Sequence, residues 1–127
     1  MSWDITIQDL PDVTSLDEIP DDFEPTPLGS RQEVIGRIKA IQPNADFSDP
    51  SWGILEGDGW SIEINAGNEG VCDSIMLHVR GGGNAPEAVN NIVQALGGRA
   101  LDHAAGEFFT LDRARQSFAE WQRYRDG

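Results

Sequence analysis

The best candidates for chemistry are four polar side chains that strand alternation places on one face of an expected sheet: Ser61, Glu63, His78 and Arg80. A serine, a histidine and a carboxylate can carry out nucleophilic or acid–base chemistry when they lie within about 3 Å of one another. The solvent-facing side of an antiparallel sheet carries polar residues in any case, and cross-strand pairs of glutamate and arginine are common there. The pattern therefore predicts a shared polar face. It leaves open whether that face binds a small ligand, catalyses a reaction or is only solvated.

A second candidate is a set of acidic and aromatic residues in and beside the expected loops. The residues that we expect to contact a partner are Asp21, Asp22, Phe23, Glu24, Asp46, Phe47, Asp49, Trp52, Glu56 and Asp58. Negative charge speeds the encounter with a basic protein, and aromatic side chains anchor the complex once it has formed. Acidic loops also keep proteins soluble without any partner, so the residue types alone do not separate these two interpretations.

The charge of the whole chain narrows the choice of partner. It has 22 acidic and 9 basic side chains, which gives a formal net charge of −13. Residues 1–29 hold eight acids and no base, and residues 40–79 hold seven acids and neither lysine nor arginine. Such a charge repels nucleic-acid phosphates and anionic lipid head groups. We therefore expect a basic protein partner, for example a toxin, and neither nucleic acid nor membrane. We expect the chain itself to be a monomer or a homodimer.

Signals for a cofactor or a metal are weak. Gly81-Gly82-Gly83 precede an expected helix, where backbone amides can bind an anion, but the lysine of a P-loop and the spaced glycines of a dinucleotide fingerprint are missing. Cys72 and His78 are expected on the same side of one strand, roughly 20 Å apart, which is too far to share an ion. We expect no cofactor and no metal site, assign no catalytic residue, and favour binding over catalysis.

The start of the chain and its cysteine content predict a cytoplasmic protein. Met1-Ser2-Trp3-Asp4 has neither the basic region nor the apolar run of a signal peptide, and no segment approaches the roughly 18 apolar residues of a membrane span. Cys72 is the only cysteine, so no internal disulfide can form.

Hydrophobic periodicity predicts the order of the secondary structure. Strands are expected at 3–10, 52–56, 60–66, 71–80 and 99–102, and helices at 30–41, 84–96 and from Thr110 onward. Ser30 and Asn84 are the expected N-caps of the first two helices. Residues 107–109 are expected to pair with the strand at 99–102 or to continue it. Residues 11–29 hold four prolines among six acids, which favours an extended loop.

This order predicts one α+β domain over residues 1–127. The strands between 52 and 80 should form a central three-stranded meander within a mainly antiparallel sheet, and about three helices should pack on one face of it as a second layer. Self-assembly through Trp3, Trp121 and Tyr124 is a further interpretation of the exposed aromatic residues.

The small size, the acidity and the α+β layout resemble bacterial immunity proteins, which bind and block a cognate toxin. The resemblance is one of class, covers the whole chain and carries over no residue motif. Glu18-Ile-Pro-Asp-Asp-Phe23 is similar to the Ile-Pro-x-x-Phe opening of SUKH-type immunity proteins. Glu24-Pro25-Thr26-Pro27 departs from that family because its prolines block the helix that follows there. The class resemblance implies a non-enzymatic inhibitor of a basic partner.

Overall fold

The computed structural model describes residues 2–11, 13–24, 26–67 and 70–126, apart from the side chains at 117–118, 121–122 and 125–126. The strands are β1 (Trp3–Gln8), β2 (Gly29–Ser30), β3 (Trp52–Gly57), β4 (Trp60–Asn65), β5 (Val71–Cys72), β6 (Ser74–Gly81), β7 (Arg99–Asp102) and β8 (Glu107–Phe108). The helices are α1 (Arg31–Ile41), α2 (Ala85–Leu96) and α3 (Leu111–Asp126), with a short 3-10 turn, η1, at Leu16–Glu18.

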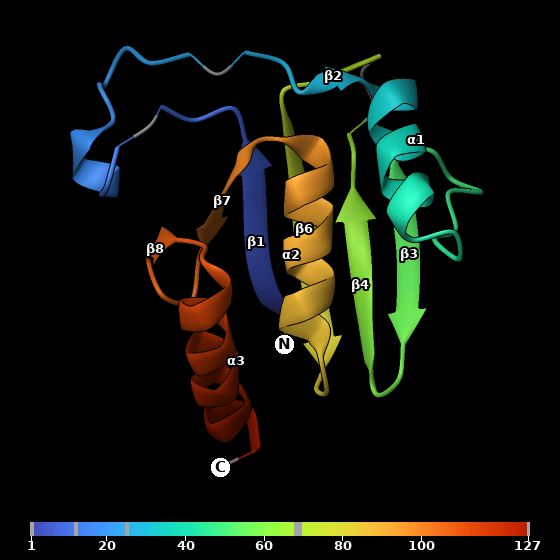
Figure 1. The fold of residues 1–127 in the computed structure, drawn as a ribbon, viewed down its shortest axis with the longest axis vertical. Coiled ribbons are helices and arrows are strands. Elements are labelled where there is room, and N and C mark those ends of the chain that lie inside the picture. Colours follow the sequence, from blue (N-terminus) through green and yellow to red (C-terminus); the bar gives the residue numbers. More distant parts are fainter. Residues whose placement is uncertain (1, 12, 25, 68–69, 127) are drawn as a thin grey trace.

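Six strands form one antiparallel sheet in the order β3-β4-β6-β1-β7-β8 (Figure 1). The predicted meander is β3, β4 and β6, which are neighbours in the sheet. The amino-terminal strand β1 adds beside β6, and β7 returns to the other side of β1 after α2. Strands β6 and β1 are therefore the two middle strands, and both neighbours of β1 come from distant parts of the chain.

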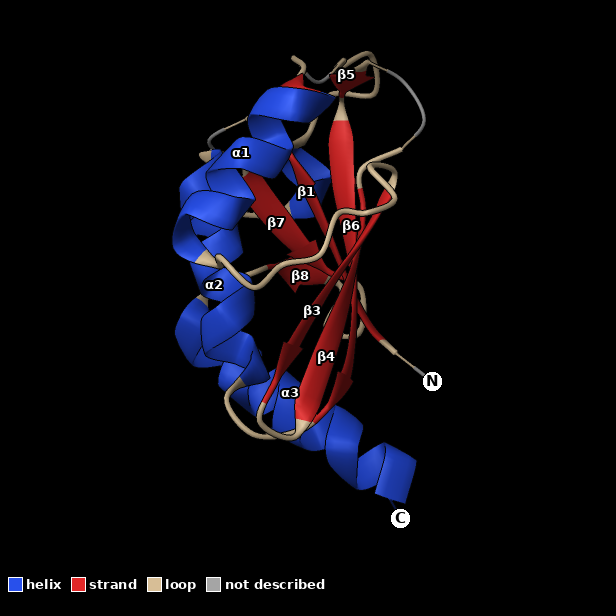
Figure 2. Ribbon diagram, turned by 90° about the vertical axis from the view of Figure 1, so that its right-hand side faces the viewer, coloured by secondary structure: helices blue, strands red, loops and turns tan. Residues whose placement is uncertain are grey.

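The helices lie on one side of the sheet, so the fold has the predicted two layers (Figure 2). Both α1 and α3 contact α2. The side of the sheet under the helices, here called the covered face, carries fully buried residues such as Ile5, Ile62 and Leu77. The side chains between them along β1, β4 and β6 are only half-buried or exposed and lie on the opposite side, here called the open face. The strict alternation confirms the period-two prediction.

Of the two expected N-caps, the structure confirms Ser30 but not Asn84. Ser30 Oγ accepts a hydrogen bond from the Glu33 amide at 3.1 Å and so caps α1. Helix α2 ends at Gly97, whose φ of 74° is left-handed and therefore suits glycine. Asn84 was expected to cap α2, but its side chain makes no capping hydrogen bond and instead accepts one from Trp60 Nε1 at 2.8 Å. None of the described helices is long and apolar enough to cross a membrane.

The expectation of one strand over 71–80 is wrong. Residues Val71–Cys72 pair with Gly29–Ser30 in a separate two-stranded sheet, and β6 begins only at Ser74. The two strands are separated by Asp73, and the backbone of Cys72 binds the Leu28 amide at 2.8 Å instead of the main sheet. Cys72 is consequently buried in the core, while His78 lies on the open face, so the two are not on one side as expected.

Candidate functional site

The four predicted polar residues do share the open face. In the pairing of β4 with β6, Ser61 stands opposite Arg80 and Glu63 stands opposite His78. In the pairing of β6 with β1, His78 stands opposite Asp4. Antiparallel residues in direct register point to the same side of a sheet, so these side chains form one polar row across three strands.

His78 is held by a carboxylate that the sequence did not single out. Its Nδ1 lies 2.8 Å from Oδ1 of Asp4, and Ser2 Oγ donates to the same carboxylate oxygen at 2.6 Å. Because an ionised carboxylate only accepts hydrogen bonds, Nδ1 of His78 carries a proton in this bond. The Trp52 ring stacks on the imidazole with 5.8 Å between centroids and 24° between planes. The imidazole is therefore fixed in position, with Nδ1 facing Asp4.

The pKa of Asp4 reflects opposing effects. Burial raises the pKa of this carboxyl, but the hydrogen bonds from Ser2 and His78, together with the electrostatic effects of His78 and His103, outweigh burial and lower it below the ordinary aspartate value. Asp4 therefore stays ionised at neutral pH and continues to orient His78. The sequence placed Asp4 in a strand with a period of two. It did not reveal that Asp4 orients His78, because the strand that pairs with β1 could not be deduced.

Among the other members of the polar row, the structure shows no hydrogen bond from Glu63 or Ser61 to His78. Arg80 forms an ion pair with Glu63, which neutralises that carboxylate. Ser61 is diagonal to His78, a position at which side chains start about 7 Å apart. The predicted serine, histidine and glutamate thus share a face without forming a nucleophile–base contact.

Two further groups on or near the sheet could carry chemistry. His103 Nε2 lies 2.6 Å from Thr6 Oγ1, which extends the polar row to the β7 side of β1. Cys72 is 2% exposed, and burial raises the pKa of its thiol above the ordinary cysteine value. A buried, protonated thiol is a poor nucleophile, so Cys72 has a structural role.

The structure divides the ten acidic and aromatic candidates into two groups. Residues 21–24 lie in the segment that crosses the end of the sheet toward β2 (Figure 1). The other six lie in or beside β3, at one edge of the sheet: Asp46, Phe47, Asp49, Trp52, Glu56 and Asp58. The two groups therefore do not make one continuous surface, and the second combines more acids with a larger aromatic side chain.

Phe47 and Trp52 lie on opposite sides of β3. A Cβ added at Gly53 would lie 2.4 Å from the Phe47 ring, so that ring packs directly on the covered side of the strand. Trp52 lies on the open face, where Ile54, two residues later, is 43% exposed. We call Asp46, Asp49, Trp52, Ile54, Glu56 and Asp58 the β3-edge surface, and Phe47 does not belong to it.

The outer backbone of β3 is occupied by the preceding loop. The Asp46 amide donates to the Ile54 carbonyl at 2.8 Å, and the Ile54 amide donates to the Asp46 carbonyl at 2.9 Å. Asn44 Nδ2 donates to the Glu56 carbonyl at 3.2 Å, and the Trp52 amide donates to the Asp49 carbonyl at 3.0 Å. These bonds block the pairing of another strand at this edge. A partner must therefore be recognised here through side chains.

The loop acids are held in defined positions. The Asp46 carboxylate accepts hydrogen bonds from Ser48 Oγ at 2.6 Å and from the Ser48 amide at 2.9 Å, and these bonds lower the pKa of Asp46. Asp49 Oδ1 accepts from the Ser51 amide at 3.0 Å. Such side-chain-to-backbone bonds are typical of aspartate in turns. They keep negative charge at the β3-edge surface in a fixed geometry.

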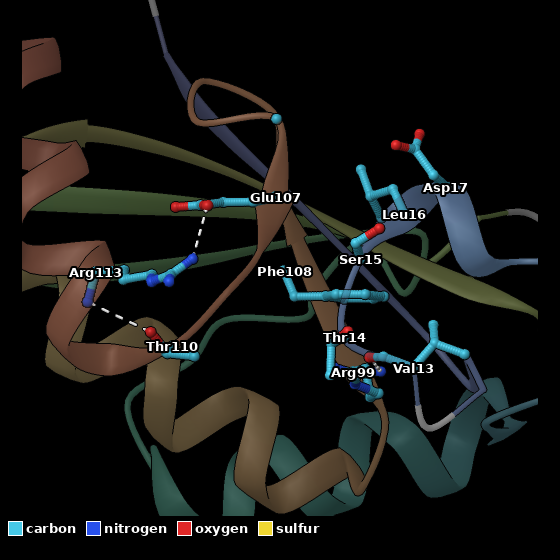
Figure 3. A pocket seen from close by; sticks show the side chains of 11 residues that line it. Val13, Thr14, Ser15, Leu16, Asp17, Arg99, Glu107, Phe108, Thr110 and Arg113 are labelled. Carbon is cyan, nitrogen blue, oxygen red and sulfur yellow. Dashed lines mark hydrogen bonds and ion pairs between the residues drawn. The ribbon is translucent and has the colours of Figure 1, made fainter.

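A pocket of about 630 Å³ lies at the other edge of the sheet, between η1, β8 and the start of α3 (Figure 3). Arg99 forms one wall: its guanidinium stacks 3.7 Å from the Phe108 ring centroid, and Nη1 donates to the Pro11 and Val13 carbonyls at 2.7 Å each. Arg113 pairs with Glu107 at 2.8 Å. Both arginines thus have partners already. Arg99 also links the segment that holds Pro11 and Val13 to β7.

The aromatic residues considered for self-assembly are only partly available. Trp3 is fully buried and cannot contribute contact area, while Tyr124 is 76% exposed. The Trp121 side chain lies outside the described residues. Among the side chains that the structure describes, no group of three or more histidine, cysteine, aspartate or glutamate residues is placed to hold a metal ion.

The fold and the β3-edge surface are thus defined by this chain's own residues. Comparison with protein-family models, with curated proteins and with solved structures finds no significant match to it. The function is therefore inferred from the geometry and the charge of the residues described above.

Proposed function

We propose that this chain is a non-enzymatic acidic protein that binds a basic protein through its β3-edge surface, as an immunity or inhibitor protein binds a toxin. One observation carries the proposal. The ion pairs among the described residues use the carboxylates of Asp4, Glu63, Glu87, Glu107 and Asp112. The acids of the β3-edge surface take no part in these pairs, so their charge is available to a cationic partner.

The arginines support the same conclusion because most of them have partners within the fold. Arg80, Arg113 and Arg115 pair with Glu63, Glu107 and Glu87, respectively. Arg37 donates to the Leu28 carbonyl, and Arg99 to two carbonyls. The net charge of −13 is therefore concentrated where the bases are not, along segments such as residues 40–79. Concentrated negative potential of this kind raises the association rate with a cationic protein.

The β3-edge surface also offers apolar contact area beside its charges. Ile54 is 43% exposed, and the half-buried Trp52 ring lies beside it on the open face, stacked on His78. Large side chains that are already ordered lose little entropy on binding and often dominate the affinity. A central apolar pair flanked by carboxylates matches the usual arrangement of an interface, in which a polar rim surrounds an apolar centre.

A second candidate function is a small-ligand or enzymatic role for the open face around Glu63, His78 and Arg80. The Asp4–His78 hydrogen bond favours it, because an imidazole oriented by a carboxylate can act as a general base. His78→Gln separates the two functions. If this variant no longer binds or turns over a small substrate but still captures a basic protein, the second candidate is favoured.

The test uses two variants of equal charge change. One neutralises the β3-edge surface by Asp49→Asn, Glu56→Gln and Asp58→Asn, and the matched control neutralises the other group by Asp21→Asn, Asp22→Asn and Glu24→Gln. Each is co-expressed with the product of the gene that neighbours it in its own genome, and growth is measured. We expect the wild-type chain and the control to restore growth that the neighbouring product arrests, and the β3-edge variant to fail.

Binding of the same purified pair is measured by calorimetry at low ionic strength and at about 1 M salt, where the Debye length is only about 3 Å. We expect the affinity to fall steeply with salt for the wild-type chain. A neighbouring product that is not basic, or equal binding by the two variants, would contradict the proposal.

A further inference from the structure

A second pocket, of about 510 Å³, lies beside the start of α1 and differs in character from the pocket at β8. Ile35, Phe47 and Pro50 form its apolar wall, and its charged side chains are Arg31 and Lys39. Among the described residues that line it there is no carboxylate, although the chain carries 22 acids against 9 bases. Positive charge beside an apolar wall suits a ligand with a negative group and an apolar body.

The spacing along α1 explains how the charges and the wall meet. Arg31, Ile35 and Lys39 are four residues apart, so they lie above one another on one face of the helix. At about 1.5 Å per residue, the Cα atoms of Arg31 and Lys39 are about 12 Å apart along the helix axis. The pocket therefore presents a cation at each end and an isoleucine between them.

The opposite wall is preformed. The Phe47 ring is half-buried and packs against Gly53, where even a methyl group would lie 2.4 Å from it. The loop that carries Phe47 is fixed to β3 by the backbone bonds between Asp46 and Ile54. The aromatic wall thus needs no rearrangement before an apolar group can pack on it, which reduces the entropic cost of binding.

The guanidinium of Arg31 is only loosely held. Its Nη1 lies 3.4 Å from both Ser51 Oγ and the Gly67 carbonyl, whereas Arg99 binds its carbonyls at 2.7 Å. A carboxylate forms shorter and stronger hydrogen bonds with arginine than neutral oxygens at such distances do. The N-cap residue Ser30 and Gln32 of the first turn of α1 also line the pocket, where the helix dipole favours an anion.

We propose that this pocket binds a small carboxylic acid with an aromatic or short aliphatic body. The carboxylate lies on Arg31 at the start of α1, and the apolar body packs between Ile35 and Phe47. The volume falls within the range of about 300–1,000 Å³ that is common for small-molecule sites. The site shares no residue with the β3-edge surface and needs no protein partner, so it can be tested independently of the proposed inhibitor function.

The experiment titrates the purified full chain with phenylacetate and with hexanoate while amide chemical shifts are followed by NMR. The neutral analogue phenylacetamide tests the need for the charge. Variants Arg31→Gln and Lys39→Gln remove the cations one at a time. The matched control is Arg37→Gln, which makes the same charge change on α1 at a residue that is not among those lining the pocket.

We expect saturable shifts at the amides of Arg31, Gln32, Ile35 and Phe47 with at least one of the two acids. Affinity should fall about tenfold for the amide analogue and for Arg31→Gln, and by less for Lys39→Gln, while Arg37→Gln binds as the wild-type chain does. If Arg31→Gln does not fold, the comparison of phenylacetate with phenylacetamide and the Lys39→Gln variant still test the proposal. The proposal is overturned by an absence of saturable shifts with both acids, or by equal binding of phenylacetamide. It is also overturned by the same shifts on raising the protein concentration alone, which would show that a second copy fills the pocket.

Discussion

The two faces of the sheet use tryptophan and aspartate in opposite ways. On the covered face, Trp3 is fully buried and donates from Nε1 to Oδ1 of Asp102 at 2.9 Å. Asp102 is 3% exposed and also accepts hydrogen bonds from the amides of Ala104 and Ala105 at 3.0 and 3.1 Å. On the open face, Trp52 stacks on His78, whose partner Asp4 keeps 40% of its side chain exposed.

The difference shows which charges the fold requires. Burying an ionised carboxylate is costly unless several donors satisfy it, and Asp102 has three within about 3 Å. That carboxylate holds the turn after β7 against β1 and is buried away from any ligand in solution. Asp4 and the acids at the β3 edge remain in contact with solvent, so their charge can act on another molecule.

The largest expected effect comes from the tryptophan of the covered face. Trp3→Ala removes a fully buried indole and should lower the free energy of unfolding by about 3–5 kcal/mol, or prevent folding. Trp52→Ala should cost only about 1 kcal/mol, because its ring is half-buried on the open face. Urea unfolding of both variants measures the difference. Equal losses would mean that the open face is as much a part of the core as the covered face.

The buried carboxylate should come next. Asp102→Ala leaves the Trp3 indole N–H and two backbone amides without their acceptor, and we expect a loss of about 1–3 kcal/mol. The variant Trp3→Phe, which removes the indole donor, serves as the partner in a double-mutant cycle. If the two changes are additive, the hydrogen bond between Trp3 and Asp102 contributes nothing to stability. The covered face would then not depend on this buried carboxylate.

The contrast also explains what the sequence could predict. Alternation in residues 3–8 and 60–65 is local, so strands were predictable there, and the buried residues Ile5, Ile62 and Ile64 follow that alternation. The end of α2 at Gly97 was likewise predictable from one residue type with a known conformational preference. Properties that depend on a strand's own residues could therefore be deduced.

Contacts between distant strands could not be deduced. The Asp4–His78 bond spans 74 residues and the Trp3–Asp102 bond spans 99. Both depend on the insertion of β1 between β6 and β7, and no pattern within a single strand specifies its neighbours. The separation of Phe47 from Trp52 was missed for a related reason, since a loop residue has no periodicity that assigns it to a face.

A smaller effect is expected when Asp4 is neutralised. The folded-state pKa of Asp4 lies below the ordinary value near 3.9, so the ionised group stabilises the fold above about pH 4 and this contribution is lost as the pH falls through the folded-state pKa. Asp4→Asn should therefore reduce stability near pH 6 and have less effect near pH 3. Exposed pairs contribute at most about 1 kcal/mol, which limits the difference. A deficit that is the same at both pH values would show that the charge of Asp4 is not responsible.

The smallest effect on stability should come from the acids at the β3 edge, although these carry the proposed function. Glu56→Gln and Asp58→Asn change exposed side chains that take no part in the ion pairs of the described residues, so stability should change by no more than about 0.5 kcal/mol. Any change should be a gain at low salt that vanishes at about 1 M, because neutralisation relieves repulsion within a chain of charge −13. Glu87→Gln is the matched control, since Glu87 pairs with Arg115 at 2.7 Å and its loss should be slightly destabilising. A clear loss of stability in the β3-edge variants would mean that these acids support the fold. The unbalanced charge of this edge would then need no partner to explain it.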